Sequence, residues 1–402
     1  MCQPTPYWLM TLLALTSTAP TWAQEQDTLK FRVNYTLQTD SNLQRLPSSA
    51  DVLARTGRNS TVERIGITMV GMSFNKAYSL QRLELDLNLV DYDYQNFSQY
   101  SFTAKTYAAA WRWSLTPRFH GSLTSDRKEA LNSFSDYQGG ASVNQRNLRT
   151  TTNSGFDASY EIDGTWGLLA GLFHTNQTSQ QTLGTGEEYS ANTASVGVRR
   201  ALGSNSTLSY NIRTSNGQYL TNSANSREYD QLDNELRLYW ALSGNTTANL
   251  VATYINRSHP SSPQRDYSGL NTSVNINWAI TGKTALVASW VRQLGSYQTS
   301  YASYTQTNRL SMGPTWQVGS KTTLGLRYDL SRIDYLGAPT AVPTAQRQDT
   351  LRDTSLTLKW QPYPLVTVIA SVAKNTRDAT VTNLSALDYR SNVGSVSAQF
   401  SF

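Results

Sequence analysis

The sequence predicts an all-β protein, a transmembrane antiparallel outer-membrane β-barrel with 18 strands, or 16 if two weaker segments are left out. Three observations predict it: apolar and polar residues alternate along the chain, short turns alternate with long polar loops, and the last strand ends at Phe402. Only 15% of the 402 residues are charged, and the mean hydropathy is −0.46. This polarity excludes a bundle of membrane helices, whereas 39% hydrophobic and 11% aromatic residues exclude a disordered chain.

The N-terminal segment has the order of a secretory signal. Residues 8–15 are apolar, small residues follow, and the segment ends with Thr-Trp-Ala at Ala23. The apolar run is too short for a spanning helix, although no Lys or Arg precedes it. We therefore expect a signal peptide over residues 1–23 and a single barrel domain over 24–402. The one cysteine, Cys2, lies within the signal, so the exported chain is expected to contain no disulfide.

A two-residue rhythm runs through the rest of the chain. From Leu29 onward every second residue is apolar and the residues between are polar, which gives a strand one apolar and one polar face. The segments 61–74 and 166–176 carry apolar residues at both parities, which leaves sixteen strands open, but either count is even, as a single-chain bacterial barrel requires. The expected strands are 28–38, 61–74, 78–95, 100–116, 119–127, 147–162, 166–176, 187–201, 206–215, 228–242, 246–257, 266–280, 284–294, 305–318, 322–335, 350–361, 365–374 and 388–402.

Turns and tryptophans predict how the barrel lies in the membrane. Short turns alternate with long loops, of which 39–60 and 127–146 are the candidates to fold inward as plugs. Outer-membrane barrels place short turns on the periplasmic side, where both termini would lie. Tryptophans that precede short turns are expected to form an interfacial ring: Trp113, Trp240, Trp278, Trp316 and Trp360. The 38-residue spacing of three of them is interpreted as repeated barrel hairpins rather than a solenoid.

The strand face that carries the polar residues would line a lumen wide enough to hold water. The candidate lumen-lining residues are Arg82, Glu84, Asp86, Arg112, Arg213, Arg237, Arg327 and Lys359. Basic rings favour anions, and the many hydroxyl and amide side chains suit sugars. The alternative is that these charges pair across neighbouring strands and stiffen the wall. Tyr92, Tyr94 and Tyr100 are interpreted as residues of an aromatic girdle, with stacking on sugars as the alternative.

Signals for catalysis or cofactors are weak. The three histidines, His120, His174 and His259, lack metal-ligand spacing, and no Gly-rich phosphate loop is present. The basic residues are spread along the chain, which argues against nucleic-acid binding. His120 and Ser122 share one strand face, which leaves a lipid-modifying barrel enzyme open. We expect no catalytic site, no cofactor and no metal.

The N-terminal third carries loose motifs of a known family. They are Tyr-Thr-Leu-Gln-Thr-Asp-Ser-Asn-Leu-Gln-Arg at 35–45, Arg-Thr-Gly-Arg at 55–58, Leu-Gln-Arg-Leu-Glu-Leu-Asp-Leu-Asn at 80–88, Trp-Arg-Trp at 111–113, Ser-Phe-Ser-Asp-Tyr at 133–137 and Gln-Arg-Asn at 145–147. In these motifs the sequence resembles the EpsL-type outer-membrane proteins of exopolysaccharide operons that accompany exosortase systems in Gram-negative bacteria. The resemblance brings no catalytic residues. Asp40, Asn42 and Arg45 match its opening motif without an assigned role.

Three functions follow as hypotheses. The leading one, which the resemblance implies, is a hydrated channel in outer-membrane lipid that passes a secreted polysaccharide, with a periplasmic polysaccharide-export protein as a partner. The second is a general diffusion porin for small solutes. The third is a lipid-modifying barrel enzyme.

Overall fold

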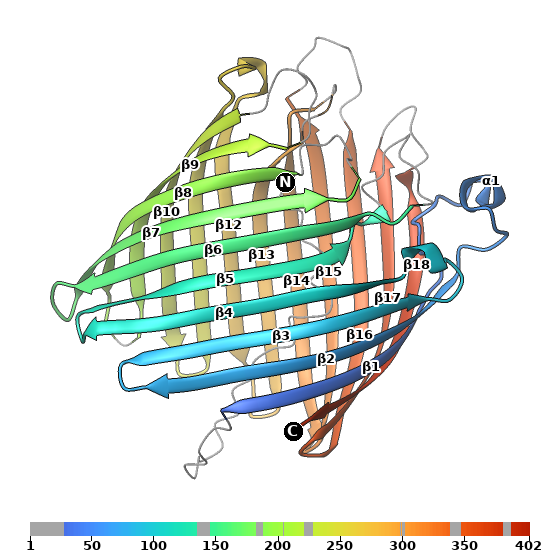
Figure 1. The fold of residues 1–402 in the computed structure, drawn as a ribbon, viewed down its shortest axis with the longest axis horizontal. Coiled ribbons are helices and arrows are strands. Elements are labelled where there is room, and N and C mark those ends of the chain that lie inside the picture. Colours follow the sequence, from blue (N-terminus) through green and yellow to red (C-terminus); the bar gives the residue numbers. More distant parts are fainter. Residues whose placement is uncertain are drawn as a thin grey trace.

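The protein is a closed antiparallel barrel of eighteen strands (Figure 1). The computed structural model describes residues 28–134, 145–181, 188–203, 205–220, 228–297, 299, 302–337, 347–380 and 387–402. The predicted strand count of eighteen is confirmed, and the sixteen-strand alternative is wrong. The predicted signal peptide lies outside the described residues.

Each strand pairs with its neighbours in the chain, and β1 and β18 close the ring. Short turns join the strands at one end, called the turn rim here, and the long loops emerge at the other, called the loop rim. The strands are β1 (Leu29–Asp40), β2 (Glu63–Tyr78), β3 (Gln81–Tyr94), β4 (Phe102–Thr116), β5 (Phe119–Leu131), β6 (Leu148–Glu161), β7 (Trp166–Ser179), β8 (Tyr189–Ala201), β9 (Thr207–Tyr219), β10 (Glu228–Ser243), β11 (Thr246–Ser258), β12 (Tyr267–Ala279), β13 (Thr284–Ser296), β14 (Tyr304–Gly319), β15 (Thr322–Leu336), β16 (Gln348–Tyr363), β17 (Val366–Thr380) and β18 (Tyr389–Ser401).

Helices occur only as short pieces in the described loops. They are α1 (Val52–Thr56), η2 (Ser98–Tyr100) and η4 (Pro263–Arg265). Asp51 caps α1 by accepting the N–H of Ala54 at 3.0 Å, and α1 projects sideways from the barrel wall (Figure 1). Among the described residues, no helix is long and apolar enough to cross a membrane.

The two weakest predicted strands form β2 and β7, and the structure explains their double apolar parity. Ile65 and Ile67 of β2 point inward but are buried beneath the loops at the loop rim, so they do not face water. Phe173 of β7 also points inward and lies against the backbone of Gly155 and Gly171, where an added Cβ would meet its ring at 2.7 Å. Inward apolar residues are thus compatible with a barrel where loops bury them, as at Ile65 and Ile67, or where glycines let them lie against the wall, as at Phe173, which stays 39% exposed.

The opposite parity forms a continuous apolar outer surface. Large hydrophobic side chains on it are exposed all round the barrel, as Phe31, Leu87, Leu172, Val372 and Val396 illustrate. A protein in water rarely exposes so much apolar area, whereas lipid chains cover such a surface favourably.

Four of the five predicted ring tryptophans lie exposed on this outer surface near the turn rim: Trp240, Trp278, Trp316 and Trp360. Trp113 also points outward, but it is buried between Phe119 and Phe156, at ring distances of 5.1 and 5.9 Å. Trp113 thus has the outward direction expected of the ring but is covered by its neighbours, unlike the other four tryptophans. The reason is Gly121 on the next strand, whose missing side chain leaves room for the indole to lie against the wall.

The register shifts between paired strands occur beside these tryptophans. The ladders shift at Ala241–Ser243, Gln317–Gly319 and Trp360–Tyr363, just before the short turns, and again after Trp113. A bulge increases local twist and bends the strand, which is useful where a hairpin must reverse within two or three residues. The 38-residue repeat corresponds to successive hairpins, of which those at Trp240 and Trp316 end in this way and the one at Trp278 has no register shift.

Substitutions on the two faces of one strand test which face contacts lipid. Val372→Arg, in the middle of β17, is expected to lower the free energy of unfolding by about 2–4 kcal/mol, because it places a charge against hydrocarbon. The adjacent inward substitution, Ser371→Arg, is expected to cost less than about 1 kcal/mol. Urea unfolding in lipid bilayers measures both, and equal costs would contradict the assignment of the faces.

Candidate functional site

The inward-facing, mostly polar side chains of all eighteen strands form the interior wall. The register of hydrogen-bonded pairs places the eight candidate residues on this wall: Arg82, Glu84 and Asp86 on β3, Arg112 on β4, Arg213 on β9, Arg237 on β10, Arg327 on β15 and Lys359 on β16. Their parity is opposite to that of the exposed leucines and valines of the same strands. They belong to three separate groups around the ring and do not form a single cluster.

The first group lies on β3 and β4. Arg82 and Arg112 are directly opposite each other in the ladder, and each lies 3.1 Å from the carboxylate of Glu84. Asp86 is bound by Arg32 of β1 at 2.6 Å. Two guanidinium groups therefore share one carboxylate here.

The second group lies on β9 and β10. Arg213 binds Glu235 at 2.9 Å and approaches Asp233 at 3.7 Å, and Arg237 lies 3.3 Å from Glu235. Arg213 thus pairs across neighbouring strands, as the alternative predicts, whereas Arg237 and Glu235 pair within one strand.

The third group lies on β14 to β16. Arg327 binds Asp329 at 2.7 Å, and the hydroxyl of Ser311 donates to the same carboxylate. Arg309 on β14 also faces inward and donates to Ser331 at 3.2 Å. Sequence reasoning missed Arg309, although it shares its parity with polar neighbours and that alternation would have found it. Lys359 has no ion pair among the residues that the structure describes.

The paired charges are not equally accessible. The side chain of Arg237 is 51% exposed and that of Arg327 is 47% exposed, whereas their partners Glu235 and Asp329 are each 6% exposed. The carboxylates thus lie against the wall, and the guanidinium groups lie over them toward the interior space. Although the charges balance in number within such a pair, the surface they present is cationic.

At the loop rim, loops fold inward onto the wall. A first apolar cluster, called the β2–β6 cluster, joins loop and strand residues: Leu43, Ile65, Ile67, Val90, Tyr94, Phe97, Tyr100, Phe102, Ala104 and Phe134. Tyr92 points inward and stacks on Phe102 at 4.7 Å, and Gln44 donates to the hydroxyl of Tyr100 at 2.8 Å. The girdle interpretation of the three tyrosines is therefore wrong. Tyr94 and Tyr100 are also too deeply buried to stack on a sugar.

A second interior cluster surrounds His259, just beyond β11. Its ring lies among Tyr219, Tyr229 and Tyr267, and the guanidinium of Arg257 sits 4.0 Å from the centre of the Tyr229 ring. Burial, and then the charge of Arg257, lower the pKa of His259, so the imidazole stays neutral. The histidine is thus a packed structural residue.

A third interior cluster joins the start of β16 to its neighbours. Asp349 is fully buried and accepts from Arg347 at 2.8 Å, Arg377 at 2.5 Å and Tyr335 at 2.8 Å. Tyr297 packs edge-on against Tyr335 at 5.0 Å. Together with the two preceding clusters, it places packed side chains on the inner wall at the loop rim in three places.

The two residues considered for lipid chemistry have separate partners. His120 lies 3.8 Å from Glu161, and Ser122 donates to Asp157. Both point to the interior, away from the surface that would contact lipid. His174 points outward and bonds Asn192 at 2.8 Å. No group of three or more candidate metal ligands occurs within the described part of the chain.

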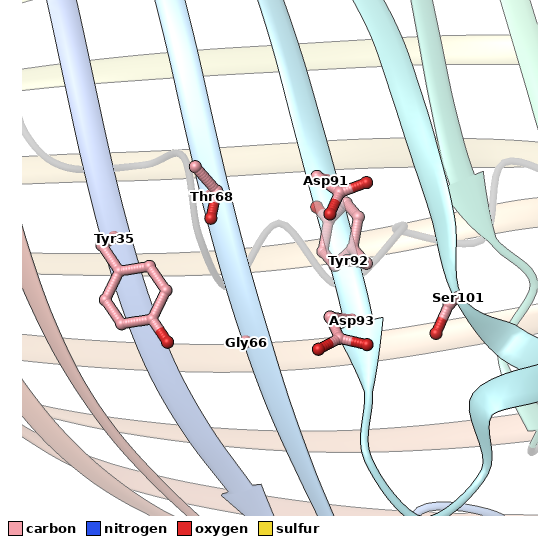
Figure 2. Close-up of a pocket in the computed structure, with 7 residues that line it drawn as sticks. All are labelled: Tyr35, Gly66, Thr68, Asp91, Tyr92, Asp93 and Ser101. Carbon is pink, nitrogen blue, oxygen red and sulfur yellow. The ribbon is translucent and has the colours of Figure 1, made fainter.

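A shallow hollow of about 250 Å³ opens on the outer surface near the loop rim (Figure 2). Tyr35 flanks it on β1, and Asp91 and Asp93 flank it on β3, across the bare backbone of Gly66. Asp91 accepts from the hydroxyl of Thr103 at 2.7 Å. The hollow is smaller than a typical ligand site of about 300–1,000 Å³, and it is separated from the interior by the wall itself.

The opening motif of the resembled family lies at the seam where the barrel closes. Asp40 at the end of β1 binds Arg45 at 2.8 Å, and Ser391 of β18 donates to the same carboxylate at 2.6 Å. The amide of Asn42 donates to the carbonyl of Arg390 at 3.1 Å. Arg45 itself has a left-handed backbone, with φ 56°, which its ion pair holds in place. These three residues therefore join the first strand to the last.

Comparison with known proteins defines the class of the fold. No family model matches the sequence, and no curated protein matches it. Among solved structures, the chain is similar to OccK2 (OpdF) of Pseudomonas aeruginosa, with a TM-score of 0.52 and 12% identity over 93% of this chain and 98% of that one. It is also similar to the outer membrane protein OpdK of the same organism, with a TM-score of 0.50 and 13% identity over 93% and 99% of the two chains.

A second structure of OpdK, with vanillate, gives the same TM-score, identity and coverage. Similarity at this level of identity establishes the fold, which is that of an outer-membrane porin barrel. Membership of the EpsL-type family stays a prediction.

The seam offers a test of what holds the barrel closed. Asp40→Ala is expected to lower the free energy of unfolding by about 3 kcal/mol, because it leaves Arg45 partly buried without its partner. Asp51→Ala, which removes only the cap of α1 outside the wall, is the control and is expected to leave barrel unfolding unchanged. Heat-induced loss of the folded band on gels and urea titration measure the difference, and equal stability of the two variants would refute the role of the seam.

Proposed function

We propose that the chain forms a passive diffusion channel for small anionic solutes. The observation that carries this proposal is the unequal exposure of the interior pairs Arg237–Glu235 and Arg327–Asp329, in which the arginines cover the carboxylates they bind. An arginine keeps its charge at any physiological pH, so the surface offered to a passing solute stays cationic. Rings of Arg and Lys favour anions in pores.

The packing of side chains at the loop rim favours passage of a small solute over passage of a polymer. Residues from described loops, among them Leu43, Phe97 and Phe134, pack into the β2–β6 cluster on the inner wall. The His259 and Asp349 clusters pack on the inner wall at the same end of other strands. A polymer would have to pass these packed side chains as a continuous strand, whereas a small ion needs only a gap between them.

The OpdK structure with vanillate gives additional support. Vanillate is a carboxylate, and the barrel that it was solved with has the same overall architecture. This fits a channel whose interior presents guanidinium groups to a solute of that charge.

Charge selectivity tests the proposal. In planar bilayers the protein is expected to favour chloride over potassium. Arg237→Gln combined with Arg327→Gln is expected to lower the anion-to-cation permeability ratio by about threefold to tenfold, because the buried carboxylates are then uncovered. Arg200→Gln on the outer face is the matched control. A channel that prefers cations, or whose reversal potential ignores the interior arginines, would overturn the proposal.

Passage of an exopolysaccharide is the second candidate. It is supported by the family resemblance and by a row of uncharged polar side chains across β11 to β14, formed by Asn249, Asn275, Ser289 and Ser311. Amide and hydroxyl groups exchange hydrogen bonds with sugars as readily as water does. A periplasmic polysaccharide-export protein would be the partner in this case.

Gene deletion separates the two candidates. If the channel serves small anions, the deletion strain is expected to keep normal surface polysaccharide and to take up small carboxylates more slowly. Polysaccharide trapped in the periplasm, measured by fractionation and sugar analysis, would favour the second candidate instead. Complementation with the Arg237→Gln and Arg327→Gln variant then shows whether uptake depends on the interior charges.

A further inference from the structure

The outer face of β13 to β18 carries a concentration of positive charge near the loop rim. The residues, called the basic surface here, are Arg292, Arg332, Arg352, Lys374 and Arg390. Each has the outward parity of its strand. All but Arg292 are exposed. Over β6 to β12 the same zone of the described strands carries Glu228 and Asp230 and no Lys or Arg. Over β2 to β5 the outward cations Arg64, Lys105 and Arg127 are matched by Asp91, Asp93 and Glu129. Over β13 to β18 the cations outnumber the outward acids Asp334, Asp378 and Asp388, so the net positive charge lies on this side of the barrel.

Three of these residues form a compact triangle. Arg352 on β16 pairs in register with Thr376 of β17, and Thr376 pairs with Arg390 of β18. Lys374 lies two residues along β17 from Thr376, on the same face. With strands about 4.8 Å apart and about 3.4 Å per residue, the three Cα atoms are about 8–10 Å from one another. Flexible cationic side chains at that separation converge readily on one phosphate group.

The positive charge of this triangle is only partly neutralised. Arg352 pairs with Asp378, but Lys374 and Arg390 have no ion pair among the described residues. Asp388, next to the triangle, accepts the backbone N–H of Ala379 at 2.6 Å. Two unpaired cations on a lipid-facing wall are costly unless an anion lies beside them.

The same strands carry the apolar belt on the side of the triangle that faces the middle of the barrel. Val372 is the next outward residue to Lys374 on β17, Leu356 is the second outward residue from Arg352 on β16, and Val396 is the third from Arg390 on β18. A molecule that placed acyl chains against these side chains would hold its headgroup at the triangle. Solvent ions offer the charge alone, whereas a lipid matches both the apolar and the basic part.

We propose that the basic surface binds a phosphate-bearing glycolipid of the outer leaflet, with phosphate groups at Arg352, Lys374 and Arg390 and acyl chains along β16 to β18. The proposal concerns the outside of the barrel and is independent of what passes through it. It makes this side of the barrel the preferred binding site of an annular lipid.

Lipid titration of the purified barrel tests the proposal. Diphosphorylated lipid A is added to the full chain in detergent micelles, and native mass spectrometry counts the bound lipid. Each Lys or Arg near an anionic lipid surface contributes about a fivefold change in affinity. The triple variant Arg352→Gln, Lys374→Gln, Arg390→Gln is therefore expected to bind at least tenfold more weakly.

A matched variant removes three outward cations from the other side of the same rim: Arg64→Gln, Lys105→Gln and Arg127→Gln on β2, β4 and β5. It is expected to bind lipid A as the unaltered protein does, and dephosphorylated lipid A is expected to bind weakly to all three proteins. Circular dichroism confirms that each variant folds. Equal binding by the two triple variants, undiminished binding of dephosphorylated lipid A, or displacement of lipid A by millimolar inorganic phosphate would overturn the proposal.

Discussion

The whole structure depends on the closure of one hydrogen-bonded ladder. In hydrocarbon no water is available to an unpaired N–H or C=O group, so a sheet can span lipid only if its first and last strands meet. Here β1 and β18 pair from Arg32–Ser401 to Asp40–Val393. The cluster of Asp40, Asn42 and Arg45 lies where this pairing ends. Its side-chain hydrogen bonds continue the connection between β1 and β18 beyond the last backbone pair.

Closure also divides the side chains into two environments. The outward-facing side chains are apolar and contact lipid. The inward-facing side chains are polar, and their charges largely neutralise one another. In the pairs Arg237–Glu235 and Arg327–Asp329 the carboxylates lie against the wall and the arginines cover them. A long guanidinium side chain reaches farther than a carboxylate from the same backbone. That difference in length turns a nearly balanced wall into a cationic surface.

Sequence reasoning succeeded where only alternation mattered and failed where packing between distant segments mattered. The inward positions of Arg82 and Arg327 follow from parity alone. The burial of Trp113 depends on Gly121 of another strand, and the inward packing of Tyr100 depends on Gln44 and Phe134 from two other loops. A pattern with a period of two contains no information about which loop will cover which residue.

The sequence by itself determined the architecture: an antiparallel barrel of eighteen or sixteen strands, the order of these strands, and which of their faces meets lipid. It did so because a strand's two faces are set by local geometry and by the solvent on each side. Only the tertiary structure decided that loops pack onto the inner wall at one end and that Arg237 and Arg327 cover their acidic partners. It also decided that Lys374 and Arg390, from different strands, stand together on the outer wall without an ion pair among the described residues. These features depend on register between strands, which brings together residues that no local pattern connects.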